Sequence, residues 1–219
     1  MEAKTNKITK VLILGAGGKV ATHVIKKLSG NSQIHLTLYL RNAGRLKHLQ
    51  SNSIKIVEGD IMDSETLRGA MQSQDIVYVN INGREDELTK QIVDAMRVAG
   101  VKRLIFIAAL GIYDEVPGAF GKWNREMIGP YIKRYKVAAN LIEASGLDYT
   151  ILRPSWYTDK DEIDYIISQK GEPVTGTEIS RKSVADLIVK LIENPKLHVK
   201  ESLGMEKPGT EGDKPAFYR

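Results

Sequence analysis

The chain has 219 residues, of which 42% are hydrophobic and 27% charged, and a formal net charge of +5. This length suits one α/β domain with its own core, while the absence of cysteine excludes disulfides and thiolate metal sites. No apolar run reaches the roughly 18 residues of a membrane-spanning helix, the N-terminus is polar, and the basic residues are scattered. We therefore expect a cytoplasmic protein with neither a membrane nor a nucleic-acid partner.

The most informative segment is a strand–turn–helix pattern near the N-terminus. A strand is predicted over residues 8–14 and a helix over 19–28, with a glycine-rich turn between them. Gly15 can adopt the positive φ that a sharp turn needs, and Gly17 and Gly18 leave backbone N–H groups accessible to phosphate oxygens. The pattern predicts a dinucleotide-binding loop; the alternative is an ordinary β–α turn. The residues expected to hold the cofactor here are Gly15, Gly17, Gly18, Lys19 and Val20.

The remaining chain alternates apolar runs with helical patterns. Strands are expected over residues 34–40, 54–57, 76–79, 104–108 and 149–152, and helices over 43–50, 64–71, 85–99, 130–144 and 180–193. Strands that are apolar throughout indicate a parallel sheet covered on both faces. We therefore predict a Rossmann-type, doubly wound α/β domain with helices on both faces over residues 1–205, followed by a loosely held tail over 206–219.

Two segments interrupt this alternation, and both follow predicted strands. Residues 110–129 and 154–178 are rich in glycine, proline and aromatic side chains. Ligands of open parallel sheets bind beyond the carboxyl ends of the strands, so both segments are candidate substrate-side loops, with Trp123, Trp156 and Tyr157 as substrate contacts. The alternative is that these aromatic side chains fill a satellite core.

The end of the second predicted strand indicates which nucleotide binds. An NAD site usually carries an acidic residue there for the ribose hydroxyls, but this strand runs into Arg41. A guanidinium suits a phosphate, so we predict that NADP(H) is preferred and NAD(H) remains possible. Asp60 and Ile61, after the third strand, are expected beside the adenine, and Asn80, after the fourth, beside the ribose or nicotinamide.

Several of these segments together resemble the atypical short-chain dehydrogenase/reductases, in particular the NmrA-like and flavin/biliverdin-reductase-like NAD(P)-binding branch. The resemblance spans roughly residues 8 to 195 and implies a Rossmann domain that binds NAD(P), with Ala108 and Pro154 among its cofactor contacts. Its most specific part is the run from Ser145 to Pro154. The segments that carry it are Gly15-Ala16-Gly17-Gly18-Lys19-Val20-Ala21, Arg41-Asn42, Gly59-Asp60, Val101-Lys102-Arg103-Leu104-Ile105 and Ser145-Gly146-Leu147-Asp148-Tyr149-Thr150-Ile151-Leu152-Arg153-Pro154.

The chain departs from the wider superfamily in its proton-relay residues. Active members pair a Tyr-x-x-x-Lys motif with an upstream serine. Lys136 stands at the lysine position and is a candidate catalytic residue and, as the resemblance implies, a candidate cofactor contact, but Ile132 replaces the tyrosine. Tyr131 is one residue away, which turns a helical side chain by about 100°. Tyr113, on the loop after the fifth strand, is the other catalytic candidate, with a purely structural role as its alternative.

Two functions remain open at this point. The first is an NADPH-dependent reductase of a flavin-like, quinone-like or other small carbonyl acceptor that works without the Ser–Tyr–Lys relay. The second is a non-catalytic NADP(H)-binding redox sensor. The four histidines show no metal-ligand spacing, so no metal site is expected. The long helices over 85–99 and 130–144 are compatible with either a monomer or a homodimer.

Overall fold

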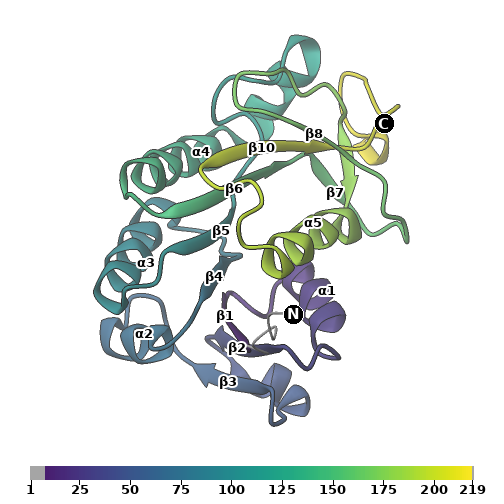
Figure 1. Ribbon diagram of the computed structural model, residues 1–219. Helices are drawn as coiled ribbons and strands as arrows, with labels where there is room; N and C mark the ends of the chain where they lie inside the picture. The colour runs from purple at the N-terminus through teal and green to yellow at the C-terminus, as the bar shows by residue number, and fades with distance from the viewer. Residues whose placement is uncertain (1–7, 219) are drawn as a thin grey trace, which may run out of the picture.

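The computed structural model describes residues 8–218 as one α/β unit (Figure 1). Its strands are β1 Thr9–Leu14, β2 Ile34–Leu40, β3 Ile54–Glu58, β4 Ile76–Val79, β5 Arg103–Ile107, β6 Asp148–Pro154, β7 Trp156–Thr158, β8 Ile166–Ser168, β9 Glu178–Ser180 and β10 Glu201–Glu206. Its helices are α1 Lys19–Leu28, α2 Ser64–Met71, α3 Glu85–Ala99, α4 Gly118–Ala144 and α5 Arg181–Glu193, with short 3₁₀ helices η1 Ala43–Leu49 and η2 Ala216–Tyr218.

The central sheet has eight strands in the order β3-β2-β1-β4-β5-β6-β10-β8. All neighbouring strands run parallel except β10 and β8, which are antiparallel. The chain builds outward from β1 through β2 to β3 and then returns to place β4 on the other side of β1. This reversal is the topological switch point at which doubly wound sheets bind ligands.

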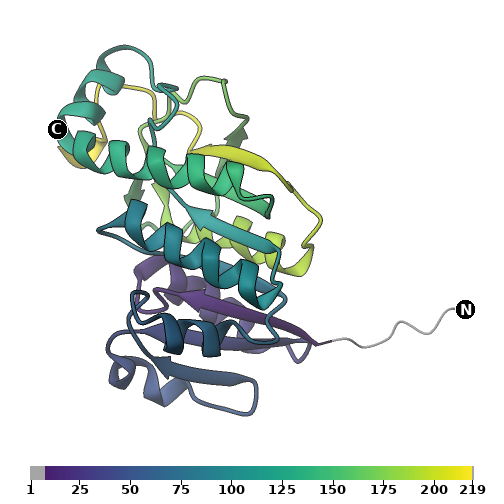
Figure 2. The same cartoon turned by 90° about the vertical axis from the view of Figure 1, so that its left-hand side faces the viewer.

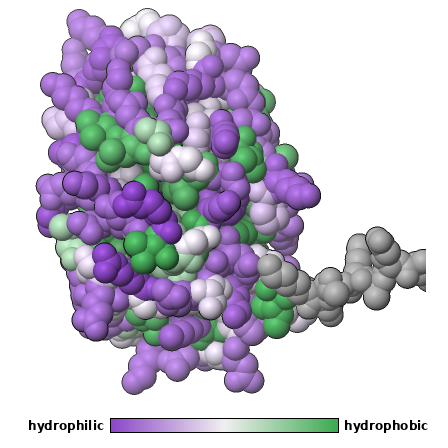
Figure 3. Space-filling model, turned by 60° about the vertical axis from the view of Figure 1, so that its left-hand side comes forward, coloured by the Kyte–Doolittle hydropathy of each residue, from purple (hydrophilic) through white to green (hydrophobic). Residues whose placement is uncertain are grey.

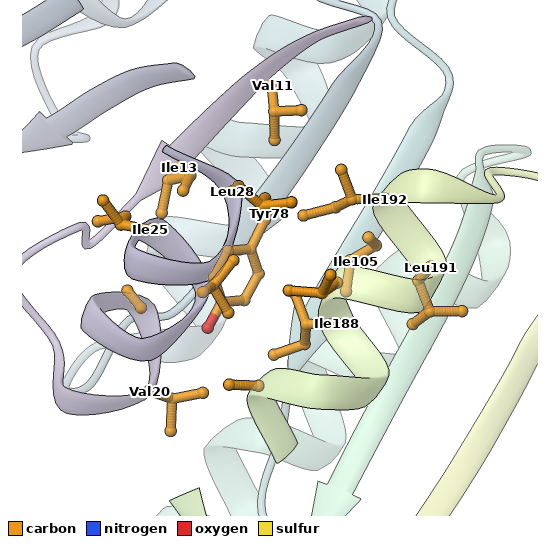
Figure 4. Close-up of a cluster of buried hydrophobic side chains, with 14 of the residues drawn as sticks. Val11, Ile13, Val20, Ile25, Leu28, Tyr78, Ile105, Ile188, Leu191 and Ile192 are labelled. Carbon is orange, nitrogen blue, oxygen red and sulfur yellow. The ribbon is translucent and has the colours of Figure 1, made fainter. Parts of the chain in front are cut away.

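Helices cover both faces of the sheet, as Figures 1 and 2 show. Along β1 the side chains of Val11 and Ile13 pack toward α1 and α5, whereas Leu12 and Leu14 pack toward α2, α3 and α4. Figure 4 shows the first of these layers, in which side chains of α1 and α5 meet over β1 and β4. The predicted doubly wound sheet is therefore confirmed. Successive side chains of a strand point to opposite faces, so a strand that is apolar throughout buries side chains under the helices on both sides.

The outer surface is mostly hydrophilic. Figure 3 brings the left-hand side of Figure 1 forward and shows small hydrophobic patches separated by polar side chains. Within residues 8–218, no helix has the length and apolar character needed to cross a lipid bilayer.

Helix α4 begins earlier than the sequence pattern predicts. The expected start was Pro130, but the helix begins at Gly118 and continues through Pro130 with a kink at Ile128, where φ is −130°. Proline lacks the N–H for the helical hydrogen bond and its ring crowds the preceding turn, which accounts for the kink. The second half of the predicted loop over 110–129 therefore forms the first part of helix α4, before the kink.

The C-terminal part of the chain is more ordered than the expected loose tail. Strand β10 pairs with β6 in the central sheet, and β7 pairs with β9 in a separate two-stranded sheet. Beyond β10, the hydroxyl of Thr177 donates to the carbonyl of Thr210 (2.6 Å), and the N–H of Ala216 donates to Oε1 of Glu178 (2.5 Å). These contacts between distant residues hold the segment after β10 against β9 and the residue before it, and the hydrophobic periodicity of the sequence does not predict them.

A buried ion pair anchors the loop after β5. Arg153, near the end of β6, and Glu115 are each fully buried and joined by a charge-assisted hydrogen bond. Glu115 also accepts from the N–H groups of Gly111 (3.0 Å) and Tyr113 (2.9 Å), and Arg153 donates to the hydroxyl of Ser202 (3.1 Å). Arg153 belongs to the run from Ser145 to Pro154 that carries the family resemblance. It therefore holds the loop after β5 through the carboxylate of Glu115.

We predict that Glu115→Ala destabilises the fold by about 3–5 kcal/mol, because it leaves the Arg153 guanidinium buried without its partner. Glu126→Ala, on the exposed side of α4, is the control and should change stability little. Urea unfolding followed by circular dichroism measures both. Equal stability of the two variants would show that the pair does not hold the loop.

Candidate functional site

The glycine turn lies against the end of β4 at the switch point. Gly15 has φ +80°, and a Cβ there would collide with the backbone carbonyl of Asn80. The N–H of Asn80 donates to the carbonyl of Leu14 (2.9 Å), and the N–H of Gly18 donates to the carbonyl of Gly15 (3.0 Å). A Cβ at Gly18 would meet the side-chain amide of Asn80. Gly15 therefore needs to be glycine, because its φ is positive and the obstacle is backbone, whereas a Cβ at Gly18 would displace the Asn80 side chain. Both glycines leave the backbone of the turn open to a ligand.

A cavity of about 480 Å³ opens above this turn and is called the glycine-loop cavity below. It extends from the turn across the ends of β2 and β3 to the loop after β4. Its lining residues are Gly15, Gly17, Gly18, Tyr39, Leu40, Arg41, Asn42, Arg45, Gly59, Asp60, Ile61, Asn80, Ile81, Asn82, Gly83, Arg84 and Leu88.

Two arginines give one end of this cavity a positive charge. Arg41 and Arg45 both line it, and Asn42 lies between them on the segment that follows β2. A guanidinium nitrogen of Arg45 lies 3.3 Å from the position that a Cβ of Gly17 would occupy, so this side chain reaches over the glycine turn. Among the lining residues the one carboxylate is Asp60. The donor set is therefore suited to an anion at this end.

Asp60 and Tyr39 form the floor beside β3. The hydroxyl of Tyr39 donates to the backbone carbonyl of Asp60 (2.8 Å), and the Asp60 carboxylate accepts from the N–H of Met62 (2.9 Å). Burial, with the nearby carboxylates of Asp63 and Asp60, raises the pKa of Tyr39 to about 12, so its hydroxyl remains a donor. Asp63 caps α2 by accepting from the N–H groups of Glu65 and Thr66.

A second cavity of about 560 Å³ adjoins the first and is called the aromatic cavity below. The two share Asn80, Ile81 and Asn82, so they meet at the end of β4. The remaining lining residues come from the ends of β5 and β6, from α4 and from the C-terminal turn: Ile107, Ala108, Ala109, Leu110, Asn124, Met127, Ile128, Tyr131, Tyr135, Pro154, Ser155, Trp156, Tyr157 and Tyr218.

An aromatic cluster forms one side of the aromatic cavity. The ring of Trp156 lies 4.7 Å from that of Trp123 and 5.4 Å from that of Tyr218, measured between centroids. The indole N–H of Trp156 donates to the side-chain oxygen of Asn124 (2.9 Å), whose amide in turn donates to the carbonyl of Leu110 (3.2 Å). The Trp156 ring is therefore fixed by hydrogen bonding, while Trp123 supports it from outside the cavity lining.

Helix α4 directs two tyrosines, and not the predicted lysine, toward the aromatic cavity. Tyr131 and Tyr135 line it four residues apart, and the hydroxyl of Tyr135 donates to the carbonyl of Ile81 (2.9 Å). Lys136 instead points away: its ammonium is half exposed and lies 3.8 Å from a carboxylate oxygen of Asp114. Ile132 is buried in the core. The face of α4 that meets the cavity therefore carries positions 131 and 135. These lie one residue before positions 132 and 136, at which the sequence comparison expected the tyrosine and the lysine.

Tyr113, the other predicted catalytic residue, also lies outside both cavity linings. Its hydroxyl donates to Oε1 of Glu143 (2.6 Å), and the ammonium of Lys170 lies 4.3 Å from the centre of its ring. Burial and the Glu143 hydrogen bond raise the pKa of this phenol. These contacts are those of a structural tyrosine.

Two predicted cofactor residues also lie outside the cavity linings. The ammonium of Lys19 is 3.2 Å from Asp159, whose other carboxylate oxygen accepts from Arg181 (2.7 Å). Val20 is buried in the core under α1. Lys136 and Trp123, described above, line neither cavity. The other predicted contacts line one or both cavities: Gly15, Gly17, Gly18, Arg41, Asp60, Ile61 and Asn80 in the first, and Asn80, Ala108, Pro154, Trp156 and Tyr157 in the second.

Sequence reasoning pointed to the loop that follows β4 but missed the role of Glu85 beside it and the contribution of the chain end. Glu85 is fully buried and accepts from the N–H of Gly83 (2.5 Å) and from Arg134 on α4 (2.8 Å). It therefore ties the wall shared by the two cavities to α4. The available signal was an acidic residue at the first position of the predicted helix over 85–99, two residues after Gly83. Tyr218, near the end of the chain, had no local signal at all.

Comparison with known proteins places this geometry in a family. A family model described as NAD(P)H-binding matches residues 15–195. A solved Rossmann-fold NAD(P)-binding family protein from Shigella flexneri is 43% identical, with a TM-score of 0.83 over 95% of this chain and 98% of that one. A short-chain dehydrogenase/reductase from Veillonella parvula, solved in complex with NADP, is 27% identical, with a TM-score of 0.89 over 95% of this chain and 99% of that one.

The curated relatives differ in the activities that their names carry. An uncharacterized sugar epimerase, YhfK, from Bacillus subtilis is 25% identical over 94% of this chain and 96% of its own length. Quinone oxidoreductase 2 from Escherichia coli is 26% identical over 68% of this chain, which spans about half (49%) of that relative. The chain belongs to the NAD(P)H-binding family, an atypical, NmrA-like branch of the short-chain dehydrogenase/reductase-like oxidoreductases.

We predict that Gly15→Ala lowers stability by about 2 kcal/mol or more and weakens binding of NADPH, because alanine is strained at φ +80° and its Cβ meets the Asn80 backbone. Gly30→Ala is the matched control, since a Cβ there has nothing within 4 Å and Gly30 does not line the glycine-loop cavity. Thermal melts with and without NADPH measure both. Indistinguishable variants would contradict the close packing of the turn on β4.

Proposed function

We propose that the protein is an NADPH-dependent reductase of planar, conjugated acceptors of the flavin or quinone type. The observation that carries this proposal is the meeting of a phosphate-suited cavity with an aromatic cavity at Asn80, Ile81 and Asn82. A reductase of this kind requires a held cofactor, a surface against which a planar ring can stack and little further chemistry from the protein.

The residues present fit a dinucleotide phosphate. Gly15 and Gly18 are positions that a Cβ would fill, and the backbone between them faces the cavity. We assign the pyrophosphate to this turn and the 2′-phosphate of NADP(H) to Arg41 and Arg45. Asp60 is assigned to the adenine side.

The aromatic cavity supplies the acceptor site. NADPH, when bound, supplies a hydride for a two-electron reduction. The wall formed by Trp156, Tyr157 and Tyr131 excludes water and orients a planar ring. Flavin-like and quinone-like acceptors take the accompanying proton from solvent, so this function needs neither Lys136 nor Tyr113. The name of the quinone oxidoreductase relative supports this acceptor class.

We predict that Arg41→Ala and Arg45→Ala each weaken NADPH binding by about 10–100-fold, the worth of a charge-assisted hydrogen bond of about 1.5–3 kcal/mol. NADH, which lacks the 2′-phosphate, should bind all three proteins equally. Arg97→Ala, at an exposed position of α3, is the control. Calorimetric titration measures each affinity. A parallel loss of NADPH and NADH affinity would overturn the assignment of the two arginines to that phosphate.

The acceptor class is tested by following NADPH oxidation at 340 nm with riboflavin, a naphthoquinone and 1,4-benzoquinone. We predict turnover with the planar acceptors, and a loss of at least about tenfold in kcat/KM for Trp156→Ala, consistent with the cost of removing a buried aromatic contact. Tight NADPH binding without oxidation by any acceptor would contradict the reductase and favour the redox-sensor alternative, to which the absence of an aligned Tyr–Lys pair also points.

A further inference from the structure

We propose that the C-terminal turn η2 forms the outer wall of the acceptor site, and that Tyr218 on this turn determines which acceptors the aromatic cavity admits. This inference rests on the proposed reductase function, since it concerns the same cavity. It assigns a specificity role to the last few residues of the chain, which lie beyond the residues matched by the family model.

Tyr218 is placed edge-on against two tryptophans. Its ring centroid lies 5.0 Å from Trp123 at an interplanar angle of 65°, and 5.4 Å from Trp156 at 85°. Edge-to-face packing at these distances is favourable for aromatic pairs. Both ribbon views place η2 beside the N-terminal part of α4 (Figures 1 and 2). The tyrosine therefore extends the aromatic wall that begins at Trp156.

The two sides of this wall are held in different ways. Trp156 belongs to β7 and is fixed through Asn124 to the backbone of Leu110. Tyr218 is held by its ring contacts and by the backbone of η2, and it remains 41% exposed at the cavity mouth. One wall is part of the sheet framework, whereas the other is a separate segment laid against it. The second wall is the one whose sequence can change without changing the fold.

A single buried carboxylate positions the turn. Glu178 in β9 is 3% exposed, and its Oε1 accepts from the N–H of Ala216 at the start of η2 (2.5 Å). The backbone carbonyl of Glu178 accepts from the N–H of Lys207 (2.8 Å), so the same residue holds the segment at two points. Its other carboxylate oxygen accepts from Lys160 (3.3 Å). Glu178 is therefore a positioning residue for Tyr218.

The chemistry of this wall favours extended planar acceptors. A single-ring acceptor is covered by contact with Trp156 alone, whereas a fused-ring acceptor extends farther along the wall that Tyr218 continues. Removing the Tyr218 ring should therefore weaken fused-ring acceptors selectively. Binding of NADPH should not change, because Tyr218 does not line the glycine-loop cavity.

The test compares Tyr218→Ala with Asp213→Ala, a control on the same C-terminal segment whose side chain is exposed and lines neither cavity. The chain has two tryptophans, and both belong to this cluster. Tryptophan fluorescence therefore reports directly on the site. Riboflavin is titrated with NADP⁺ saturating, which gives a dissociation constant without turnover. We expect Tyr218→Ala to weaken riboflavin binding by about 3–10-fold, as for the loss of an aromatic pair.

Steady-state kinetics provide the second measurement. In Tyr218→Ala the KM for riboflavin should rise by the same factor, while the KM for 1,4-benzoquinone changes less than about twofold. Glu178→Ala should show the same changes in KM as Tyr218→Ala, because it removes the acceptor for the Ala216 N–H. Glu178→Gln should keep KM values near those of the wild type, because its amide oxygen still accepts. Melting temperatures of all variants separate these effects from unfolding.

The outcomes separate this inference from the proposed function. Equal riboflavin affinity in Tyr218→Ala and Asp213→Ala, with both folded, would overturn the role of Tyr218. Equal weakening of riboflavin and benzoquinone would overturn its role in selecting acceptors by size. If the wild-type protein binds riboflavin but oxidises no NADPH, while Tyr218→Ala loses that binding, the wall stands as a ligand site and the reductase function fails.

Discussion

The close approach of the glycine turn to the end of β4 is the constraint on which the rest of the site depends. A side chain at Gly15 would overlap the backbone of Asn80, and one at Gly18 would overlap its amide. Because glycine stands at both positions, the turn after β1 packs directly against the end of β4 at the switch point. The resulting crevice opens on one side to the arginines that follow β2 and on the other to the aromatic residues of α4 and β7.

The segment after β4 joins the two halves of this crevice. It lines both cavities, and it is held to α4 by the hydrogen bond of Tyr135 to Ile81 and by the ion pair of Arg134 with the buried Glu85. A ligand that contacts the glycine turn and an acceptor that contacts α4 therefore share one rigid wall. Such a wall offers positioning without a dedicated acid or base, which is consistent with a reductase whose acceptors need little else.

Residues distant in sequence complete the acceptor side. The Arg153–Glu115 pair fixes the loop after β5, and Glu178 fixes the segment that ends in Tyr218. Both anchors are buried carboxylates that accept backbone N–H groups, and both hold irregular segments whose own packing is limited. The same kind of contact thus stabilises the inner and outer walls of the aromatic cavity.

Sequence by itself determined the first six strands of the sheet and the glycine turn, because hydrophobic period and glycine placement are local properties. Helices α1, α2 and α3 have the predicted bounds, and Arg41, Asp60 and Asn80 line the predicted cavity. Tertiary structure decided the rest. A shift of one residue on α4 turned Lys136 away and brought Tyr131 and Tyr135 to the cavity. Strand β10, the path of the chain end and the position of Tyr218 depend on contacts between residues far apart in the chain, which no local pattern encodes.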